Sequence, residues 1–200
     1  MDPFRIPQPN DRMLIGLDVD GVVADLIGSL LHAIRQRTGQ LFLPEHVQSF
    51  NLRNSLGNLW TVVEDILSEP GFARDLSPYP GAIDGIIKLR SLGRVVFVTS
   101  PFHRSPTWSH ERAVWLHQHT GTHRRDIVHL DDKTVFAGHV LIDDAPHQLE
   151  AWVNTQRPAV RVVRPWNQDA PGLPAHSWDE IVEQTQVALE ASTQPDKLVW

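Results

Sequence analysis

The sequence contains no cysteine. Disulfide bridges and thiolate metal sites are therefore excluded, and a reducing compartment suits the chain. It also has no apolar run of the length that crosses a membrane. The first residues, MDPFRIPQPNDRM, lack the apolar core of a signal peptide. We therefore expect a cytoplasmic protein without a membrane partner.

An excess of basic residues is absent as well. Lys and Arg total 18 against 24 Asp and Glu, which gives a formal net charge of −6. A protein that binds a long nucleic acid needs a basic surface, so no such partner is expected. A small anionic ligand stays compatible with this balance if positive charge gathers locally. The 200 residues, 41% of them hydrophobic, fit one domain or one domain with a modest insertion.

Five short apolar runs predict strands that are buried on both faces of a sheet. They comprise residues 13–17, 94–98, 126–130, 139–142 and 159–163. Segments with apolar residues at helical spacing lie between them at 83–89, 108–119 and 146–155, and after the last of them at 177–191. Strands that alternate with helices predict an α/β fold: a Rossmann-like parallel sheet of about five strands, flanked by helices on both faces.

Residues 26–80 interrupt the alternation. They contain helical patterns at 26–38 and 59–67, no strong strand pattern, and several prolines. We interpret this segment as a small helical cap inserted after the first strand. The chain then divides into a core domain of residues 13–25 and 81–191, a cap of residues 26–80, and flexible tails of residues 1–12 and 192–200.

Polar residues gather where the predicted strands end. They are, in chain order, Asp18, Asp20, Thr99, Ser100, Lys133, Asp143 and Asp144. The carboxyl ends of parallel strands meet at one edge of a sheet, and open sheets bind their ligands at that edge. We therefore expect these seven side chains to lie close together.

Carboxylates that converge in a small volume raise one another's pKa unless a cation compensates them. Oxygen ligands without histidine or cysteine favour Mg²⁺ over Zn²⁺. Because Mg²⁺ typically takes an oxygen of a phosphate, Lys133 and the Thr99 hydroxyl are expected donors to the other phosphate oxygens. Gly21 permits a sharp turn after Asp18 and Asp20, so one carboxylate can attack phosphorus while the other donates a proton to the leaving oxygen.

Four motifs follow one another along the chain: Asp18-Val19-Asp20-Gly21-Val22-Val23-Ala24-Asp25, Thr99-Ser100-Pro101, Asp132-Lys133-Thr134 and Leu141-Ile142-Asp143-Asp144. In this order they resemble the haloacid dehalogenase superfamily, and most of all its 5′(3′)-deoxyribonucleotidase branch. The resemblance covers most of residues 13–165 and is weakest in the cap. It implies a HAD-like core fold and Mg²⁺-dependent hydrolysis of nucleoside monophosphates.

The resemblance also implies a role for each motif residue. Asp18 would be the nucleophile that forms an aspartyl-phosphate. Asp20 would protonate the leaving nucleoside oxygen and then activate water. Asp143 would complete the Mg²⁺ site with Asp18 and the main-chain carbonyl of Asp20, and Asp144 would support that site. The phosphoryl group would be held by Thr99, Ser100 and Lys133.

The residues that would contact the sugar and the base are less well defined than those that would hold the phosphoryl group. In the nucleotidases the residue two positions before the motif lysine is typically arginine, whereas here it is Asp131, so we expect a different contact with the phosphate or sugar. The aromatic residues of the cap either stack on a base or form the core of the cap, and we expect the core role for about two of them. These residues are Phe42, Phe50, Trp60 and Phe72, and Phe102 is a further candidate outside the cap.

Other functions stay open on the residues alone. One is a phosphatase for another small ester, such as a sugar phosphate. A second is a non-catalytic binding module with the same fold, which the intact aspartates, threonine and lysine speak against. A third is a phosphatase for nucleic-acid ends, which the acidic balance disfavours. None of the eleven histidines has a partner at metal spacing. A homodimer is compatible with the sequence, although no motif indicates it.

Overall fold

A sheet of six strands forms the centre of the molecule. It is seen in a computed structural model that describes residues 13–193. The strands are β1 (Leu14–Leu17), β2 (Arg94–Thr99), β3 (Ile127–His129), β4 (Val140–Asp143), β5 (Ala159–Val162) and β6 (Leu173–Ala175). All neighbours pair in parallel, in the order β3-β2-β1-β4-β5-β6. The predicted α/β fold with a parallel sheet is therefore confirmed.

Five of these strands match the five apolar runs to within one residue at their carboxyl ends, but β6 is not predicted by the sequence. It has three residues, one of them Pro174, and it lies in no continuous apolar run, whereas the equally short β3 does. Because β6 pairs only with β5 at the edge of the sheet, a proline is tolerated there. The expected number of about five strands is one too low for this reason.

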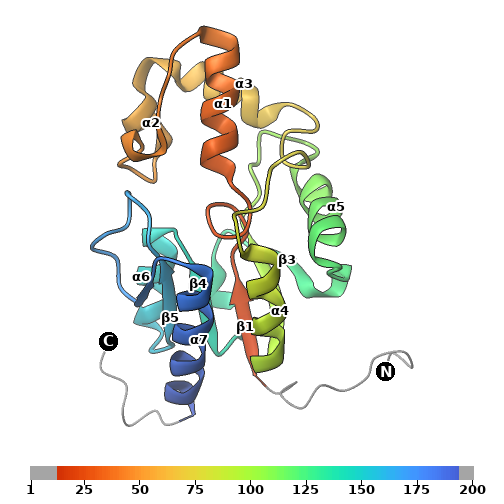
Figure 1. The fold of residues 1–200 in the computed structure, drawn as a ribbon, viewed down its shortest axis with the longest axis vertical. Helices are drawn as coiled ribbons and strands as arrows, with labels where there is room; N and C mark the ends of the chain where they lie inside the picture. The colour runs from red at the N-terminus through yellow and green to blue at the C-terminus, as the bar shows by residue number, and fades with distance from the viewer. Residues whose placement is uncertain (1–12, 194–200) are drawn as a thin grey trace.

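Helices cover both faces of the sheet (Figure 1). They are α4 (Ala82–Leu92), α5 (Trp108–Thr120), α6 (Pro146–Asn154) and α7 (Trp178–Ser192). The crossover connections from β1 to β2, through α4, and from β2 to β3, through α5, move toward one edge of the sheet. The connection from β4 to β5, through α6, moves toward the other edge. Since parallel crossovers are right-handed, α4 and α5 share one face and α6 takes the opposite one. None of the described helices is long and apolar enough to cross a membrane.

The buried side chains agree with this arrangement. One cluster contains residues of α4, α5 and α7 together with alternate residues of the central strands, such as Ile15 and Ile142. A second, on the other face, contains Leu141 with Leu149 and Trp152 of α6. The strands are thus buried on both sides, which explains their continuous apolar runs.

A second group of helices lies between β1 and α4. Its elements are α1 (Leu26–Thr38), η1 (Pro44–His46), α2 (Leu52–Leu56), η2 (Gly57–Leu59) and α3 (Trp60–Ser68), where η marks a 3-10 helix. Helix α1 begins where the Asp25 carboxylate accepts a hydrogen bond from the backbone N–H of Gly28 at 2.9 Å. The short α2 is not predicted, because five residues are too few to show a helical period.

These helices lie together at one end of the molecule, away from α4 and α7 (Figure 1). They bury a hydrophobic cluster largely of their own, which includes Leu30, Ile34, Val63 and Ile66. Their separate core supports the proposal that residues 26–80 form a cap on a core of residues 13–25 and 81–191. The predicted tails lie outside the described residues, apart from Ser192 and Thr193 at the end of α7.

Two segments connect the core with the cap, and they lie side by side. The backbone N–H of Asp25 donates to the carbonyl of Ser77 at 2.8 Å, and that of Tyr79 donates to the carbonyl of Val23 at 2.8 Å. The outgoing and returning chains therefore form a short paired link. This link follows directly after β1, so the cap stands over the edge of the sheet where the strands end.

Glu111 of α5 fastens the returning segment to the core. Its carboxylate accepts hydrogen bonds from the backbone N–H groups of Gly71 at 2.6 Å and Ala73 at 3.1 Å. Burial raises the pKa of Glu111, but these hydrogen bonds and one from Thr107 outweigh burial and leave the pKa below its usual range. Glu111 is thus held as a carboxylate.

Replacing Glu111 by glutamine should lower the free energy of unfolding near neutral pH by about 1–3 kcal/mol, because buried charge-assisted hydrogen bonds are lost. A carboxyl with a depressed pKa stabilises the fold above its unfolded-state pKa of about 4.3 and loses this contribution as the pH falls through the lower folded-state value. Urea unfolding at several pH values should show the difference between wild type and Glu111→Gln shrinking in acid. Glu183→Gln, on the exposed side of α7, is the control, and a pH-independent difference would contradict this role.

Candidate active site

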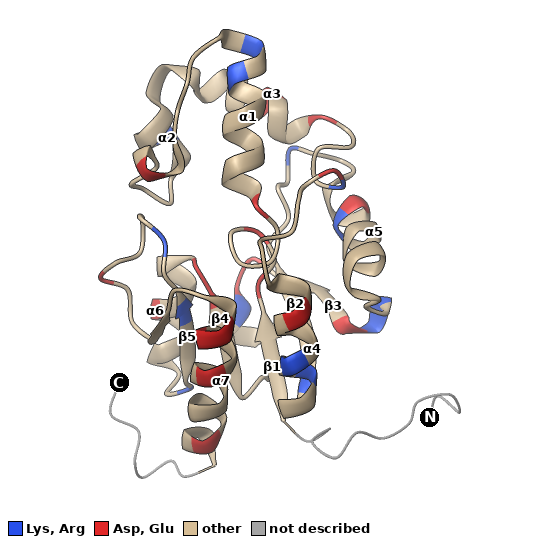
Figure 2. Ribbon diagram, in the orientation of Figure 1, with Lys and Arg blue, Asp and Glu red and all other residues tan. Residues whose placement is uncertain are grey.

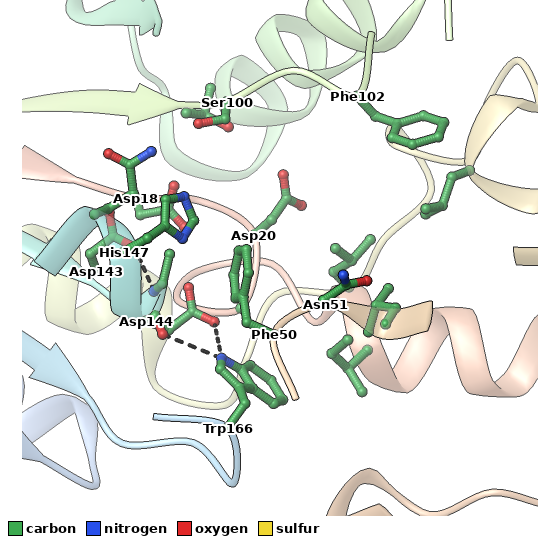
Figure 3. A pocket seen from close by; sticks show the side chains of 18 of the residues that line it. Asp18, Asp20, Phe50, Asn51, Ser100, Phe102, Asp143, Asp144, His147 and Trp166 are labelled. Atoms are coloured by element: carbon green, nitrogen blue, oxygen red, sulfur yellow. Dashed lines mark hydrogen bonds between the residues drawn. The ribbon is translucent and has the colours of Figure 1, made fainter. Parts of the chain in front are cut away.

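A cavity of about 460 Å³ lies between the strand ends and the cap. Its floor includes Asp18, Thr99, Lys133 and Asp143, and cap residues form the opposite wall. Figure 2 shows acidic residues where β1 and β4 end, facing the cap, and Figure 3 looks into the cavity. A volume of this size is typical of sites for small molecules. The cap residues of the wall are Leu26, Ile27, Ser49, Phe50, Asn51, Leu52, Trp60 and Leu67.

Lys133 joins two of the strand-end aspartates. Its Nζ donates to Asp18 Oδ1 at 2.5 Å and to Asp143 Oδ2 at 2.7 Å. The two aspartates are neighbours because β1 pairs with β4, and Lys133 begins a 3-10 turn, η4 (Lys133–Val135). Burial lowers the pKa of Lys133, but the charges of Asp143 and Asp18 outweigh this and raise it. All three side chains are buried, so the lysine stays charged within the floor of the cavity.

Asp18, Asp143 and Asp144 form a cluster of carboxylates. Each offers one oxygen atom, and these atoms lie within 4.8 Å of one another. Burial raises the pKa of Asp18 to about 7, although Lys133 acts in the opposite direction. Burial also raises the pKa of Asp144, and Asp18 and Asp143 add to the effect. One lysine does not neutralise three buried carboxylates, so the cluster suits a divalent cation that prefers oxygen ligands.

The Asp144 carboxylate belongs to this cluster, whereas the sequence assigns it only a supporting place. Trp166 Nε1 donates to Asp144 Oδ2 at 3.2 Å (Figure 3), and Asn167 Nδ2 donates to the Asp144 carbonyl at 2.8 Å. Gly21 has a φ of 85°, and a β-carbon there would lie 2.3 Å from Asp144 Oδ2. The glycine of the first motif therefore makes room for the carboxylate of the last.

Asp20 is directed to a different partner. Its Oδ1 accepts a hydrogen bond from Arg112 Nη2 at 2.5 Å, and its carboxylate is not part of the cluster formed by the other three aspartates. Burial raises the pKa of Asp20, while Arg112 and Lys133 lower it. The two aspartates of the first motif therefore have different surroundings: one lies among carboxylates, the other beside a guanidinium.

Thr99 and Ser100 end β2 and both line the cavity. The Thr99 hydroxyl is fully buried and has no hydrogen-bond partner among the described residues. A buried hydroxyl is costly unless something binds it, so Thr99 has an unmet capacity for a ligand at this place. The Ser100 hydroxyl instead donates to the carbonyl of Leu130 at 2.8 Å.

The turn that carries Lys133 is held from two sides. Gln148 Oε1 accepts a hydrogen bond from the Lys133 backbone N–H at 3.3 Å. The Arg157 guanidinium donates to the carbonyls of Thr134 at 2.7 Å and Phe136 at 2.6 Å. These contacts fix the backbone from which the lysine side chain enters the cavity.

The predicted substrate contacts fall into two groups. Trp60 and Phe102 line the cavity, as does Phe50, whose ring is 5.1 Å from that of His147. Phe42 and Phe72 do not line it. Both pack against the hydrophobic cluster of the cap, and Trp60 packs against that cluster as well as lining the cavity. Two of the four cap aromatics thus face the cavity, and one of these two, Trp60, also belongs to the cap core.

Asp131 lies outside the cavity wall. Its carboxylate is largely exposed and is paired with His103 Nε2 at 2.8 Å. Its backbone carbonyl accepts a hydrogen bond from Gln148 Nε2 at 2.6 Å. The side chain is therefore turned to solvent and its main chain toward the site.

Several residues around the site are not singled out by the sequence. Arg112 had a usable signal: it follows Trp108 by four residues and precedes Trp115 by three, so a charge lies on the apolar stripe of a helix. The others have no local signal, because loops and tertiary packing bring them to the cavity. They are Asn51, His147, Gln148 and Trp166.

Comparison with known proteins gives consistent results. A family model described as 5′ nucleotidase, deoxy (pyrimidine), cytosolic type C protein matches residues 12–192. A protein of Bordetella pertussis, provisionally named 5′(3′)-deoxyribonucleotidase, is 33% identical over 174 residues, covering 83% of this chain and 91% of the relative. The human cytosolic 5′(3′)-deoxyribonucleotidase is 34% identical over 147 residues, covering 66% of this chain and 70% of the relative. Mitochondrial forms from human and mouse match as well.

Solved structures agree on the fold. A haloacid-dehalogenase-type hydrolase of Bacillus subtilis, described as bound to magnesium, aligns with a TM-score of 0.55 at 11% identity, covering 86% of this chain and 97% of that one. The family match and the identity to the bacterial and human relatives together show that this chain belongs to the 5′(3′)-deoxyribonucleotidase family of the haloacid dehalogenase superfamily.

Proposed function

We propose that the protein is a Mg²⁺-dependent phosphatase that hydrolyses nucleoside monophosphates, with deoxyribonucleotides as its main substrates. The observation that carries this proposal is the contact of Lys133 with Asp18 and Asp143 at the floor of a cavity, with Asp20 beside them. The relatives support the substrate class, because they are named 5′(3′)-deoxyribonucleotidases.

The residues present fit a magnesium ion. The carboxylates of Asp18, Asp143 and Asp144 would hold it, with the main-chain carbonyl of Asp20 as a further ligand. Hard oxygen atoms are the ligands that Mg²⁺ prefers. Burial, together with the neighbouring carboxylates, raises the pKa of Asp18 and of Asp144, and a bound cation would offset this effect. When bound, the ion supplies positive charge that offsets the repulsion between the phosphate and the attacking carboxylate.

Asp18 would attack phosphorus. A bond forms between its carboxylate oxygen and phosphorus, and the bond from phosphorus to the nucleoside oxygen breaks. Asp20 donates a proton to that oxygen, so the nucleoside leaves as a neutral alcohol. Asp20 then takes a proton from the water that attacks the aspartyl-phosphate, which releases inorganic phosphate and restores Asp18.

The phosphoryl group would be bound by Lys133 and by the hydroxyl of Thr99, which has no hydrogen-bond partner within residues 13–193. Ser100 would contribute from the rim of the same strand end. The nucleoside would lie toward the cap, where Phe50, Trp60 and Phe102 offer aromatic surfaces.

The proposal includes a cytoplasmic location, which the cytosolic human relative supports. One chain supplies every residue named for the chemistry, so the proposed reaction needs no partner subunit. Two alternatives are tested below. The first experiment distinguishes the proposed phosphatase from a non-catalytic binding module, and the second distinguishes a nucleotide substrate from a sugar phosphate.

Replacing Asp18 by asparagine should reduce phosphate release from nucleoside monophosphates by at least about 10³-fold, because the nucleophile is lost. Removing Mg²⁺ with a chelator should have a comparable effect on the wild type, reversed by adding the ion back. Asp84→Asn, on the exposed side of α4, is the matched control and should keep full activity. If the wild type releases no phosphate from any ester in the presence of Mg²⁺, the phosphatase proposal is contradicted and the alternative of a non-catalytic binding module is favoured.

Replacing Trp60 by alanine should raise KM for a nucleoside monophosphate about 10-fold, within the ~1–3 kcal/mol of a base–aromatic stack. The activity on ribose 5-phosphate, which has no base, should change little. Phe42→Leu is the control, because Phe42 packs in the cap core and does not line the cavity. An equal loss on both substrates would show that Trp60 contributes to cap folding and not to nucleoside binding.

A further inference from the structure

Arg112 is a charged residue in a buried place. Its side chain has no exposed surface, and the guanidinium lies 5.5 Å from the ring of Trp108 and 5.6 Å from that of Trp115. Removing a guanidinium from water is costly unless its hydrogen bonds and its charge are met. The position of Arg112 therefore needs an explanation beyond packing.

The charge of Arg112 is met by Asp20 through the 2.5 Å contact between Nη2 and Oδ1. The Nε atom is buried and has no hydrogen-bond partner among the described residues. An incompletely satisfied ion pair of this kind is a weak source of stability, and apolar residues of similar volume often stabilise a fold as well or better. What the pair does provide is a fixed direction for the Asp20 carboxylate.

Arg112 also reaches the segment that returns from the cap. Its Nη1 donates to the carbonyl of Ala73 at 3.1 Å, and the neighbouring Glu111 binds the backbone N–H of the same residue. One guanidinium thus contacts Asp20 on one side and the cap's return on the other. The planar fork of arginine allows two contacts in fixed relative directions, which a lysine ammonium does not reproduce.

We infer that Arg112 is a positioning residue that fixes the carboxylate of Asp20 and ties it to the returning segment of the cap. This inference rests on the proposed function, in which Asp20 donates a proton to the leaving oxygen. Without Arg112, the Asp20 carboxylate would rotate away from the direction that serves this step. The loss of rate should therefore depend on how much the leaving group needs a proton.

Two substrates separate this role from a general structural one. A nucleoside leaves as an alcohol and needs the proton of Asp20, whereas p-nitrophenol leaves readily as its anion. We expect Arg112→Met to lower kcat for a nucleoside monophosphate by about 10²-fold or more, since positioned proton transfer contributes about 10²–10⁴-fold. KM should stay within about 3-fold, and kcat for p-nitrophenyl phosphate should fall much less. Arg112→Lys retains the charge and should recover part of the kcat.

A double variant tests whether Arg112 acts through Asp20. In the Asp20→Asn background, adding Arg112→Met should cause little further loss, because residues that act as a unit are not additive. Glu111→Gln is the matched control: it loosens the same backbone segment without touching Asp20, so it should leave the ratio of the two substrates unchanged. Thermal unfolding of each variant checks the fold, and Arg112→Lys carries the test if Arg112→Met does not fold.

The outcomes distinguish the inference from the proposed function. Equal losses on both substrates in the Arg112 variants, or a full additional loss in the Asp20→Asn background, would overturn the inference while leaving the phosphatase assignment intact. If Asp20→Asn itself does not slow nucleoside release, the acid–base role of Asp20 fails and the inference fails with it. The positioning role is supported if Arg112→Met slows the nucleoside substrate selectively and causes little further loss in the Asp20→Asn background.

Discussion

The site depends on the contact between one ammonium and two carboxylates. A parallel sheet places Asp18 and Asp143 at adjacent strand ends, and their charges would repel each other if nothing lay between them. Lys133 bridges them from a turn that Gln148 and Arg157 hold in place. The neighbouring Asp144 brings a third carboxyl group to the cluster, and three carboxyl groups beside one ammonium make the floor of the cavity receptive to a cation.

The two aspartates of the first motif show how backbone geometry gives two like residues different surroundings. Asp18 still belongs to the sheet edge, with its backbone N–H bonded to the carbonyl of Ile142 at 2.9 Å. Asp20 lies past the strand, before the turn at Gly21, and its side chain meets Arg112 from another helix. Two residues of one type, separated by a single valine, thus receive different cationic partners: Lys133 for Asp18 and Arg112 for Asp20.

Much of the core could be predicted from the sequence, because buried parallel strands produce continuous apolar runs and their polar endings mark one edge. The sequence does not predict elements that are too short to show a pattern, nor side chains that tertiary packing alone brings to the site. Strand β6 has three residues, one of them a proline, and lies in no apolar run, and α2 has only five residues. Phe50 and Phe42 are alike as residues, and only the packing of the cap decides that one faces the cavity. Arg112 is recognisable as a charged residue on the apolar side of a predicted helix. Trp166 has no such local signal, because it contacts Asp144 across 22 positions of sequence.

The paired link at Val23–Asp25 and Ser77–Tyr79 has an architectural consequence. The chain leaves the core and returns to it at adjacent positions. The insertion is therefore, with respect to the core, a loop whose two ends are held together. The entropy of closing such a loop grows only with the logarithm of its length. The segment between the two ends can therefore lengthen, shorten or change its helices with little penalty to the sheet, and substrate choice can diversify while the phosphate chemistry below it stays the same.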